Sequence, residues 1–245
     1  KFNIHPTYIQ LILQDKRYSF SEQNELIKHL SKIDSKKFDP NFLTNFHSIK
    51  KINKKWNANN WCVNRNILLL GQGSSLRSVQ IQKKIEKFIL IKKPMVISIN
   101  INKFILNEFI DYYVSCHDGR ILVDHKKYNS LNKKIILPLD ILKSFSNFEK
   151  NNSFLDYGIK IKLNEFKCFD KYTILPFNES LGYAIALSII GGSKDIFLAG
   201  VDGYEKNHNT NIKTQKLLRL VKKKYPHINL KTLTKTRNQI ELLKV

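Results

Sequence analysis

The stretch NESLGYAIALSIIGGSKDIFLAGVDGY, residues 178–204, decides the fold class of this 245-residue chain. Its pattern is that of an apolar helix, a glycine break, a buried strand and a polar turn that carries Asp202 and Tyr204. His208 follows shortly after this turn. Because ligands of open α/β sheets bind outside the carboxyl ends of the strands, we expect this acid, phenol and imidazole to belong to a binding site.

A second glycine turn lies in LLLGQGSSL, residues 68–76, directly after another apolar run. Gly71 and Gly73 allow the backbone to turn sharply and to approach a phosphate or a ribose, and the helix that follows favours negative charge. Leu76 stands where a dinucleotide fingerprint has its third glycine, and no Gly-Lys-Ser/Thr of a P-loop follows. A plain tight turn and an S-adenosylmethionine site are the alternative interpretations.

From Asn66 onward, short β-branched runs alternate with segments of helical periodicity. We predict strands at 67–70, 95–99, 112–116, 135–137, 172–175, 196–199 and 228–233, and helices at 76–91, 180–190 and 211–224. This alternation predicts an α/β fold with a mostly parallel, Rossmann-like sheet and helices on both faces. Residues 1–60 are polar and predict a small helical extension or a linker ahead of a domain that spans residues 61–245.

Two asparagines, Asn100 and Asn102, follow the second predicted strand, and Ser-Cys-His-Asp at 115–118 follows the third. An amide both donates and accepts hydrogen bonds, so it suits the edge of a pyrimidine or the hydroxyls of a ribose. Capping of the next helix is the alternative function of these asparagines. For His117 and Asp118 the sequence favours a structural role, since it places no further metal ligands close to them.

Cys62, Cys116 and Cys168 form no CxxC pair, so the sequence predicts neither a disulfide framework nor a zinc site, and a reducing cytoplasm is expected. The formal net charge of +22 favours anionic partners, although AT-biased coding also produces lysine-rich chains. Because the lysines are spread along the chain, we expect a surface that faces a membrane or a polyanion. We do not expect sequence-specific binding of nucleic acid. No apolar run approaches the roughly 20 residues that span a bilayer.

Three blocks of the chain together resemble a known family. These are LLLGQGSSL, SLGYAIALSIIGGSKDIFLAGVDGY and HNTNIKTQKLLRLVKKKYPHINLKTL, and in that order they resemble the family 42 bacterial sialyltransferases over roughly residues 64–240. Members of that family are inverting enzymes of lipooligosaccharide assembly. Each has a single nucleotide-binding α/β domain, a sialyltransferase variant of the GT-A fold. The resemblance implies a CMP-activated sugar acid as donor, an anionic lipopolysaccharide or capsule glycan as acceptor, no metal or other cofactor, and a homotetramer.

The resemblance also implies which residues bind the donor. Gln72 and Gly73 match the donor-binding turn, in which the family has Asn-Gly, and either Asn100 or Asn102 matches an asparagine after the second strand. Ser180 matches a serine at the start of the central helix. The donor-binding set that the resemblance implies is Gly71, Gln72, Gly73, Ser74, Asn100, Asn102, Ser180, Gly200 and Asp202, with Asp202 facing the cytidine ribose or neighbouring backbone.

Two further residues match the family's catalytic groups. Tyr204 would donate a hydrogen bond to the departing phosphate, and His208 would act as the general base that deprotonates the acceptor hydroxyl. The chain departs from the family in having only five residues between Asp202 and His208, where the family has a long lid with a second phosphate-binding tyrosine. Lys206 or Asn207 would have to substitute for that tyrosine. The departure leaves the donor sugar open between sialic acid, another nonulosonic acid and Kdo.

Residues 4–8, Ile-His-Pro-Thr-Tyr, resemble the tail of aldolase-type barrels that precede such transferase domains, so we expect the chain to be part of a larger bifunctional protein. Other functions compete with the transferase. A pterin pyrophosphokinase-like enzyme would use ATP and Mg²⁺, and a methyltransferase would have an acid where Asn100 stands. A non-enzymatic polyanion-binding module would depend on charge alone. Our leading hypothesis is a metal-independent glycosyltransferase, held by its positive charge near the cytoplasmic face of the membrane.

Overall fold

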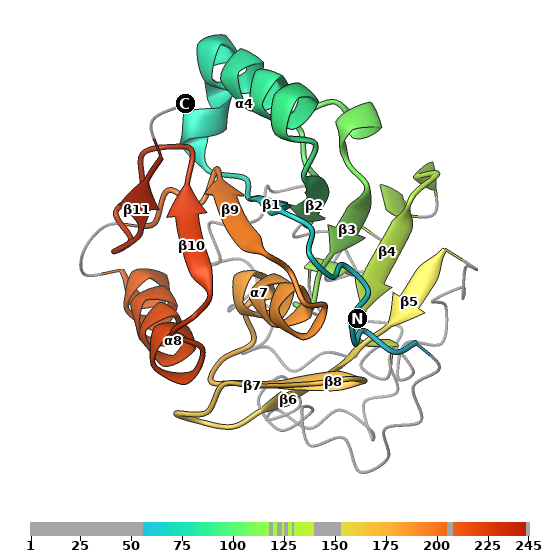
Figure 1. Cartoon of the computed structure of the whole chain (residues 1–245), viewed down its shortest axis with the longest axis vertical. Helices are drawn as coiled ribbons and strands as arrows, with labels where there is room; N and C mark the ends of the chain where they lie inside the picture. The colour runs from blue at the N-terminus through green and yellow to red at the C-terminus, as the bar shows by residue number, and fades with distance from the viewer. Residues whose placement is uncertain are drawn as a thin grey trace, which may run out of the picture.

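The computed structural model describes residues 56–117, 120–121, 124, 127–128, 130–139, 153–204 and 208–243. The helical extension predicted within residues 1–60 lies almost entirely outside these ranges. The described part is built around an eight-stranded sheet with helices packed against it (Figure 1).

All neighbouring strands of the large sheet are parallel, in the order β11-β10-β9-β1-β2-β3-β4-β5. The predicted α/β class with a mostly parallel, Rossmann-like sheet is therefore confirmed. The strands are β1 Ile67–Leu70, β2 Met95–Ile99, β3 Tyr112–Val114, β4 Lys134–Leu137, β5 Phe154–Asp156, β9 Asp195–Ala199, β10 Asn229–Thr232 and β11 Glu241–Leu242.

The central strand β1 is buried on both faces, as expected for a parallel strand in the middle of such a sheet. Leu68 and Leu70 point into a core shared with helix α4, Val79–Lys92. Ile67 and Leu69 point into a core shared with α7, Ser180–Ile190, and α8, Asn209–Lys224. Figure 1 shows α4 on one side of the sheet and α7 and α8 on the other. The prediction of helices on both faces is confirmed.

The helix predicted at 76–91 is divided into two elements. A 3-10 helix, η2 Ser74–Arg77, precedes α4, and Ser78 between them has an extended backbone with φ −73° and ψ 120°. Leu76 is fully buried and packs against Gly200, which has φ +67° and where an added Cβ would lie 2.5 Å from Leu76. The chain therefore turns inward at η2 before α4 begins. A second short 3-10 helix, η3 Asn107–Phe109, follows β2.

A second, three-stranded sheet lies on the side of α7 away from the large sheet (Figure 1). Its order is β6-β8-β7, with β6 and β8 parallel and β7 antiparallel to β8. The strand predicted at 172–175 was expected in the main sheet, and the structure places it here instead. Its burial alternates along the strand, whereas β1 is buried throughout. These strands are β6 Gly158–Ile161, β7 Lys167–Phe169 and β8 Tyr172–Leu175.

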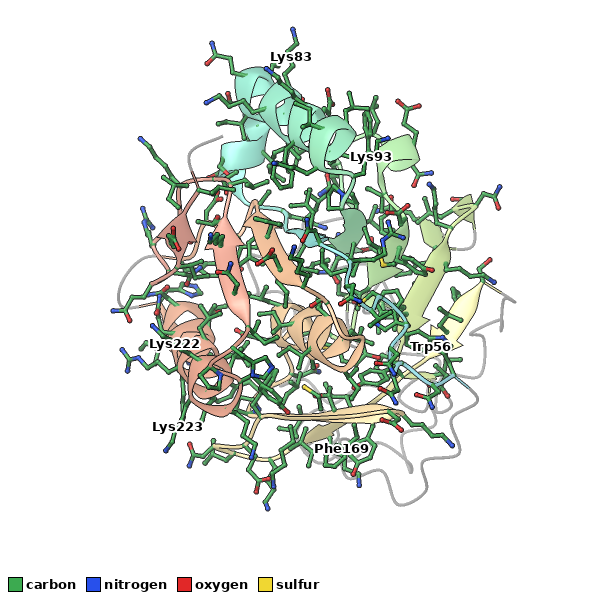
Figure 2. The ribbon with its side chains drawn as sticks, viewed as in Figure 1. Trp56, Lys83, Lys93, Phe169, Lys222 and Lys223 are labelled. Atoms are coloured by element: carbon green, nitrogen blue, oxygen red, sulfur yellow. The ribbon has the colours of Figure 1, made fainter. Side chains whose placement is uncertain are left out.

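The first described residues pack against the domain that follows them. The indole Nε1 of Trp61 donates to the Leu187 carbonyl of α7 at 2.9 Å. Trp56 meets Trp61 edge to face with ring centroids 5.5 Å apart, and Trp61 meets Tyr112 in the same way at 5.0 Å. Figure 2 shows Trp56 beside the large sheet. None of the helices in the described parts of the chain combines the length and apolar composition needed to cross a bilayer.

Candidate functional site

The candidate site lies where the strand order of the large sheet reverses. The chain passes from β1 to β2 and onward to one edge of the sheet, and it later returns to place β9 on the other side of β1. The carboxyl ends of β1 and β9 therefore flank a topological switch point, which is where open α/β sheets bind ligands. Two backbone hydrogen bonds join the turn after β1 to the end of β9. Gly71 N donates to Ala199 O at 2.8 Å, and Gly73 N donates to Gly200 O at 2.7 Å.

The carboxylate of Asp202 joins these two turns. It accepts hydrogen bonds from Ser75 N at 2.7 Å, from Ser75 Oγ at 2.6 Å and from Ser74 Oγ at 3.3 Å. An added Cβ at Gly73 would lie 2.4 Å from the carboxyl carbon of Asp202, so the contact requires glycine. Three donors of this turn that could otherwise bind a phosphate are thus engaged by a carboxylate of the same chain.

Gln72 and Asn102 hold the loop after β2 against the turn after β1. Gln72 Nε2 donates to the Ile101 carbonyl, and Asn102 Nδ2 donates to the Gly71 carbonyl at 3.0 Å. The Asn102 oxygen accepts from the backbone N–H groups of Phe104 and Ile105 at 2.8 and 2.9 Å. These contacts are those of the loop-capping alternative for Asn102.

Asn100 has a different environment from Asn102. Its backbone adopts φ +61°, a left-handed conformation that asparagine tolerates, and its Oδ1 accepts from Ser115 Oγ at 2.6 Å. This bond fixes which way the amide faces. Among the described residues, Nδ2 of Asn100 has no hydrogen-bond partner, and the side chain is partly exposed. Asn100 therefore presents two N–H donors at the carboxyl end of β2.

The amino end of α7 lies at the carboxyl end of β3. Ser180 Oγ accepts from Cys116 N at 3.2 Å, which ties the first turn of the helix to the residues that follow β3. Glu179 is the N-cap residue and makes no side-chain cap, and its Oε1 accepts instead from Thr214 Oγ1 of α8 at 3.0 Å. The ring of Phe177, just before this helix, has Lys213 and Lys216 of α8 each 5.7 Å from its centroid.

Tyr204 and His208 form a parallel stack, with ring centroids 4.7 Å apart and an interplanar angle of 14°. Tyr204 is 42% exposed. His208 is the N-cap of α8, and its Nδ1 accepts from Thr210 N at 3.2 Å. Since Nδ1 serves as an acceptor, the neutral ring carries its proton on Nε2. Lys206 and Asn207, the proposed substitutes for a missing tyrosine, lie outside the described residues, as does Asp118.

The structure thus gathers the predicted residues in several groups along one edge of the sheet. The two turns around Asp202 form the first group, the stack of Tyr204 on His208 forms the second, and Asn100 and Ser180 lie at the ends of β2 and β3. The side chains that hold these groups in place are Ser75, Ser115 and Thr210. Sequence reasoning placed Ser75 and Ser115 in candidate segments but assigned them no partner, and it did not single out Thr210. Each lies within two positions of a predicted or considered residue, and this clustering of small polar residues was the signal available.

The described residues contain no group of three or more His, Cys, Asp or Glu side chains arranged to hold a metal ion. No disulfide bond joins any two of Cys62, Cys116 and Cys168. Burial raises the pKa of Cys62 to about 12, and it does the same for Cys168, so these two thiols are protonated at neutral pH. A nucleophilic role of either thiol is therefore disfavoured.

Neither the models of known protein families nor the curated proteins compared with this chain gave a match. The resemblance to sialyltransferases accordingly depends on the sequence blocks quoted above.

Proposed function

We propose that the chain is a metal-independent, inverting glycosyltransferase that moves a sialic-acid-like or Kdo-like sugar acid from a CMP donor to a cell-surface glycan. The observation that supports this most is the gathering of a phenol, an imidazole and an oriented amide at the switch point of a parallel sheet. The acceptor would be an anionic lipopolysaccharide or capsule glycan at the cytoplasmic face of the membrane. The active assembly would be a homo-oligomer.

In this proposal the donor nucleotide binds along the carboxyl ends of β1, β2 and β3. The two N–H donors of Asn100 would bind acceptor atoms of the cytosine edge or the ribose. The phosphate of CMP gains negative charge as the sugar departs, and the Tyr204 hydroxyl would donate a hydrogen bond to it. Lys213 and Lys216 beside Phe177 supply positive charge near the amino end of α7.

His208 would act as the base in the transfer step. The acceptor oxygen forms a bond to the anomeric carbon, the bond from that carbon to the phosphate oxygen breaks, and the acceptor proton passes to His208. The neutral ring has its free electron pair on Nδ1, which accepts from Thr210 N in this structure. Proton uptake at Nδ1 would therefore require the cap bond at the start of α8 to open, so proton transfer and the amino end of α8 would be coupled.

Nucleotide binding provides the first test. Thermal-shift and calorimetric titrations would compare CMP, CDP, UDP, ATP with Mg²⁺, and S-adenosylhomocysteine. We expect selective stabilisation by CMP without metal, weakened in Tyr204→Phe and unchanged in Tyr172→Phe, whose ring lies in the small sheet. Stabilisation by ATP with Mg²⁺ and by no other nucleotide would favour the pyrophosphokinase-like alternative. Indifference to every nucleotide would leave the polyanion-binding module.

Turnover provides the second test. CMP release from CMP-sialic acid and CMP-Kdo would be measured with a lipooligosaccharide acceptor, for the natural chain and for two variants. His208→Ala should lower the rate about 10²- to 10⁴-fold, as loss of a general base does. His227→Ala, which alters a histidine in the loop after α8, should retain the rate. Equal rates for both variants would exclude His208 as the base.

A further inference from the structure

Helix α4 exposes large apolar side chains among lysines. Val79, Leu90 and Ile91 are 60%, 62% and 62% exposed. Lys83 and Lys87 precede Leu90 by two turns and one turn of helix, so these side chains share the outer face of α4, opposite the buried Ile85, Phe88 and Ile89. Figure 2 shows Lys83 projecting from α4 away from the sheet.

A pocket of about 270 Å³ adjoins the same helix. It lies between α4 and the segments at the ends of β10 and β11, and its lining includes the apolar side chains of Ile81, Ile85, Leu233 and Leu242 together with Lys84 and Lys235. Leu242 is 48% exposed. Because Ile85 belongs to the buried side of α4, this pocket is separate from the outer face that carries Leu90 and Lys83.

The charge on α4 is strongly positive. The helix and its C-cap carry five lysines, Lys83, Lys84, Lys87, Lys92 and Lys93, all exposed, against the single acid Glu86. Lysines at a surface attract any polyanion, but a soluble polyanion such as a nucleic acid gains little from Leu90 and Ile91. A bilayer with anionic lipids binds both kinds of side chain, because the lysines meet head groups while the apolar side chains enter the interface.

We propose that the outer face of α4, which carries Lys83, Lys87, Leu90 and Ile91, forms a docking surface for an anionic phospholipid bilayer. The helix lies along the membrane surface, Leu90 and Ile91 enter the head-group layer, and Lys83 and Lys87 contact lipid phosphates. The proposal does not depend on the transferase activity, since it uses residues outside the candidate site.

Vesicle sedimentation tests the surface. Vesicles of equal parts phosphatidylglycerol and phosphatidylcholine should bind the natural chain, and pure phosphatidylcholine vesicles should not. Lys83→Gln with Lys87→Gln should weaken binding roughly thirtyfold at low salt, from the usual contribution of a lysine near an anionic surface. Leu90→Ser with Ile91→Ser, which keeps the charge, should weaken it at least about tenfold.

Matched controls decide between a specific surface and general charge attraction. Lys222→Gln with Lys223→Gln changes two lysines at the end of α8, and Leu163→Ser changes a leucine that is 63% exposed after β6. Both controls should bind as the natural chain does. Equal losses in the control and α4 variants, or indifference to Leu90→Ser with Ile91→Ser, would overturn the proposal in favour of a general polyanion surface.

A fluorescent probe tests insertion directly. Leu90→Trp should show a blue shift on binding phosphatidylglycerol vesicles and quenching by lipids with brominated tails. Leu163→Trp should show neither, and the native Trp56 and Trp61 give the same background in both variants. Quenching of both probes, or of neither, would contradict the placement of α4 at the membrane.

Discussion

At the scale of single residues, the Asp202 carboxylate holds together the two turns of the candidate site. Ser74 and Ser75 direct three donors toward it, from a turn that lies beside it only because β1 pairs with β9. Since a negative charge already neutralises the start of η2, a donor phosphate would bind elsewhere along the edge. Under the proposed function, Tyr204 and the amino end of α7 are the groups that remain for the phosphate, while Asn100 would bind the nucleoside.

Substitution of Asp202 tests this structural role. Asp202→Asn retains one acceptor oxygen but presents N–H groups to donors, so we expect the free energy of unfolding to fall by about 1–3 kcal/mol. Urea denaturation measures the change. Asp195→Asn, at a carboxylate that accepts from Asn229 at 2.7 Å, is the matched control and should cost less than about 1 kcal/mol. A loss for Asp202→Asn no larger than this control would show that the two turns are held by other contacts.

Ser115 offers a second test, on the orientation of Asn100. Ser115→Ala removes the donor to Asn100 Oδ1 and lets the amide turn, so under the proposed function CMP binding should weaken roughly three- to tenfold. In an Asn100→Ala background the same change should have no further effect on CMP binding, because no amide remains to orient. Calorimetric titration of the single and double variants measures this, and additive losses would argue against an orienting role.

The position of the site residues was predictable, but their partners were not. Polar residues after a buried strand mark the carboxyl edge of a parallel sheet, so Asp202, Tyr204 and Asn100 were placed by pattern alone. The bond between Ser75 and Asp202 joins residues 127 positions apart, and it depends on the register of two strands. Local sequence does not contain that register. Local sequence also does not show that Asn102 caps the backbone of its own loop while the amide nitrogen of Asn100 has no described hydrogen-bond partner.

At the scale of elements, α7 and α8 approach closely at Gly182. An added Cβ there would lie 2.9 Å from one methyl carbon of Leu217 and 3.0 Å from the other. Glycine inside a helix lowers the stability of the helix by about 1 kcal/mol relative to alanine. Gly182 therefore weakens α7 but allows the close contact with α8. The contact also joins α8, which carries His208 at its amino end, to the central helix of the domain.

A double-mutant cycle tests the contact between the two helices. Leu217→Ala alone should lower the free energy of unfolding by about 2–5 kcal/mol through the cavity it leaves. Gly182→Ala should be neutral or destabilising in the natural chain, where the methyl group meets Leu217. In the Leu217→Ala background it should stabilise by about 1 kcal/mol, because the contact is gone and the helix propensity remains. Equal effects in both backgrounds would show that the helices do not touch there.

The elements that pattern reading found and missed differ in length and burial. β1, β2 and β9 are fully or largely buried runs of four or five residues, and each was predicted within one residue of its bounds. Short strands such as β7 and β11, with three and two residues, have too few positions to show any periodicity. β8 was found, but its membership of the small sheet was not, because pairing partners are chosen by tertiary contacts.

At the scale of the whole molecule, buried phenols and thiols predict alkaline sensitivity. Burial raises the pKa of Tyr113 and Tyr225 to about 12, from an ordinary 10, and those of Cys62 and Cys168 to about 12, from 9. The unfolded chain therefore loses these protons first as pH rises. The contribution of these protonated groups to the free energy of unfolding is fully present below pH 9, and it is lost progressively as the pH rises toward 12.

Urea denaturation across that alkaline range, with tyrosinate absorbance followed in the folded state, checks the prediction. We expect the midpoint to fall as pH rises, and part of the tyrosinate signal to appear only on unfolding. Titration of all tyrosines at the ordinary phenol pKa in the folded protein would contradict the assigned burial.

The placement of β1 between β2 and β9 has a consequence during synthesis. A nascent chain can form the ladder between Leu68 and Val96 early, but the partner of the other edge, at Phe197, leaves the ribosome much later. Until then a wholly apolar central strand has one open edge, a condition in which chains self-associate or engage chaperones. Pairing of the second edge of β1 therefore coincides with the emergence of Asp202 and Tyr204, so the open edge closes at the stage of synthesis at which the turns around Asp202 can form.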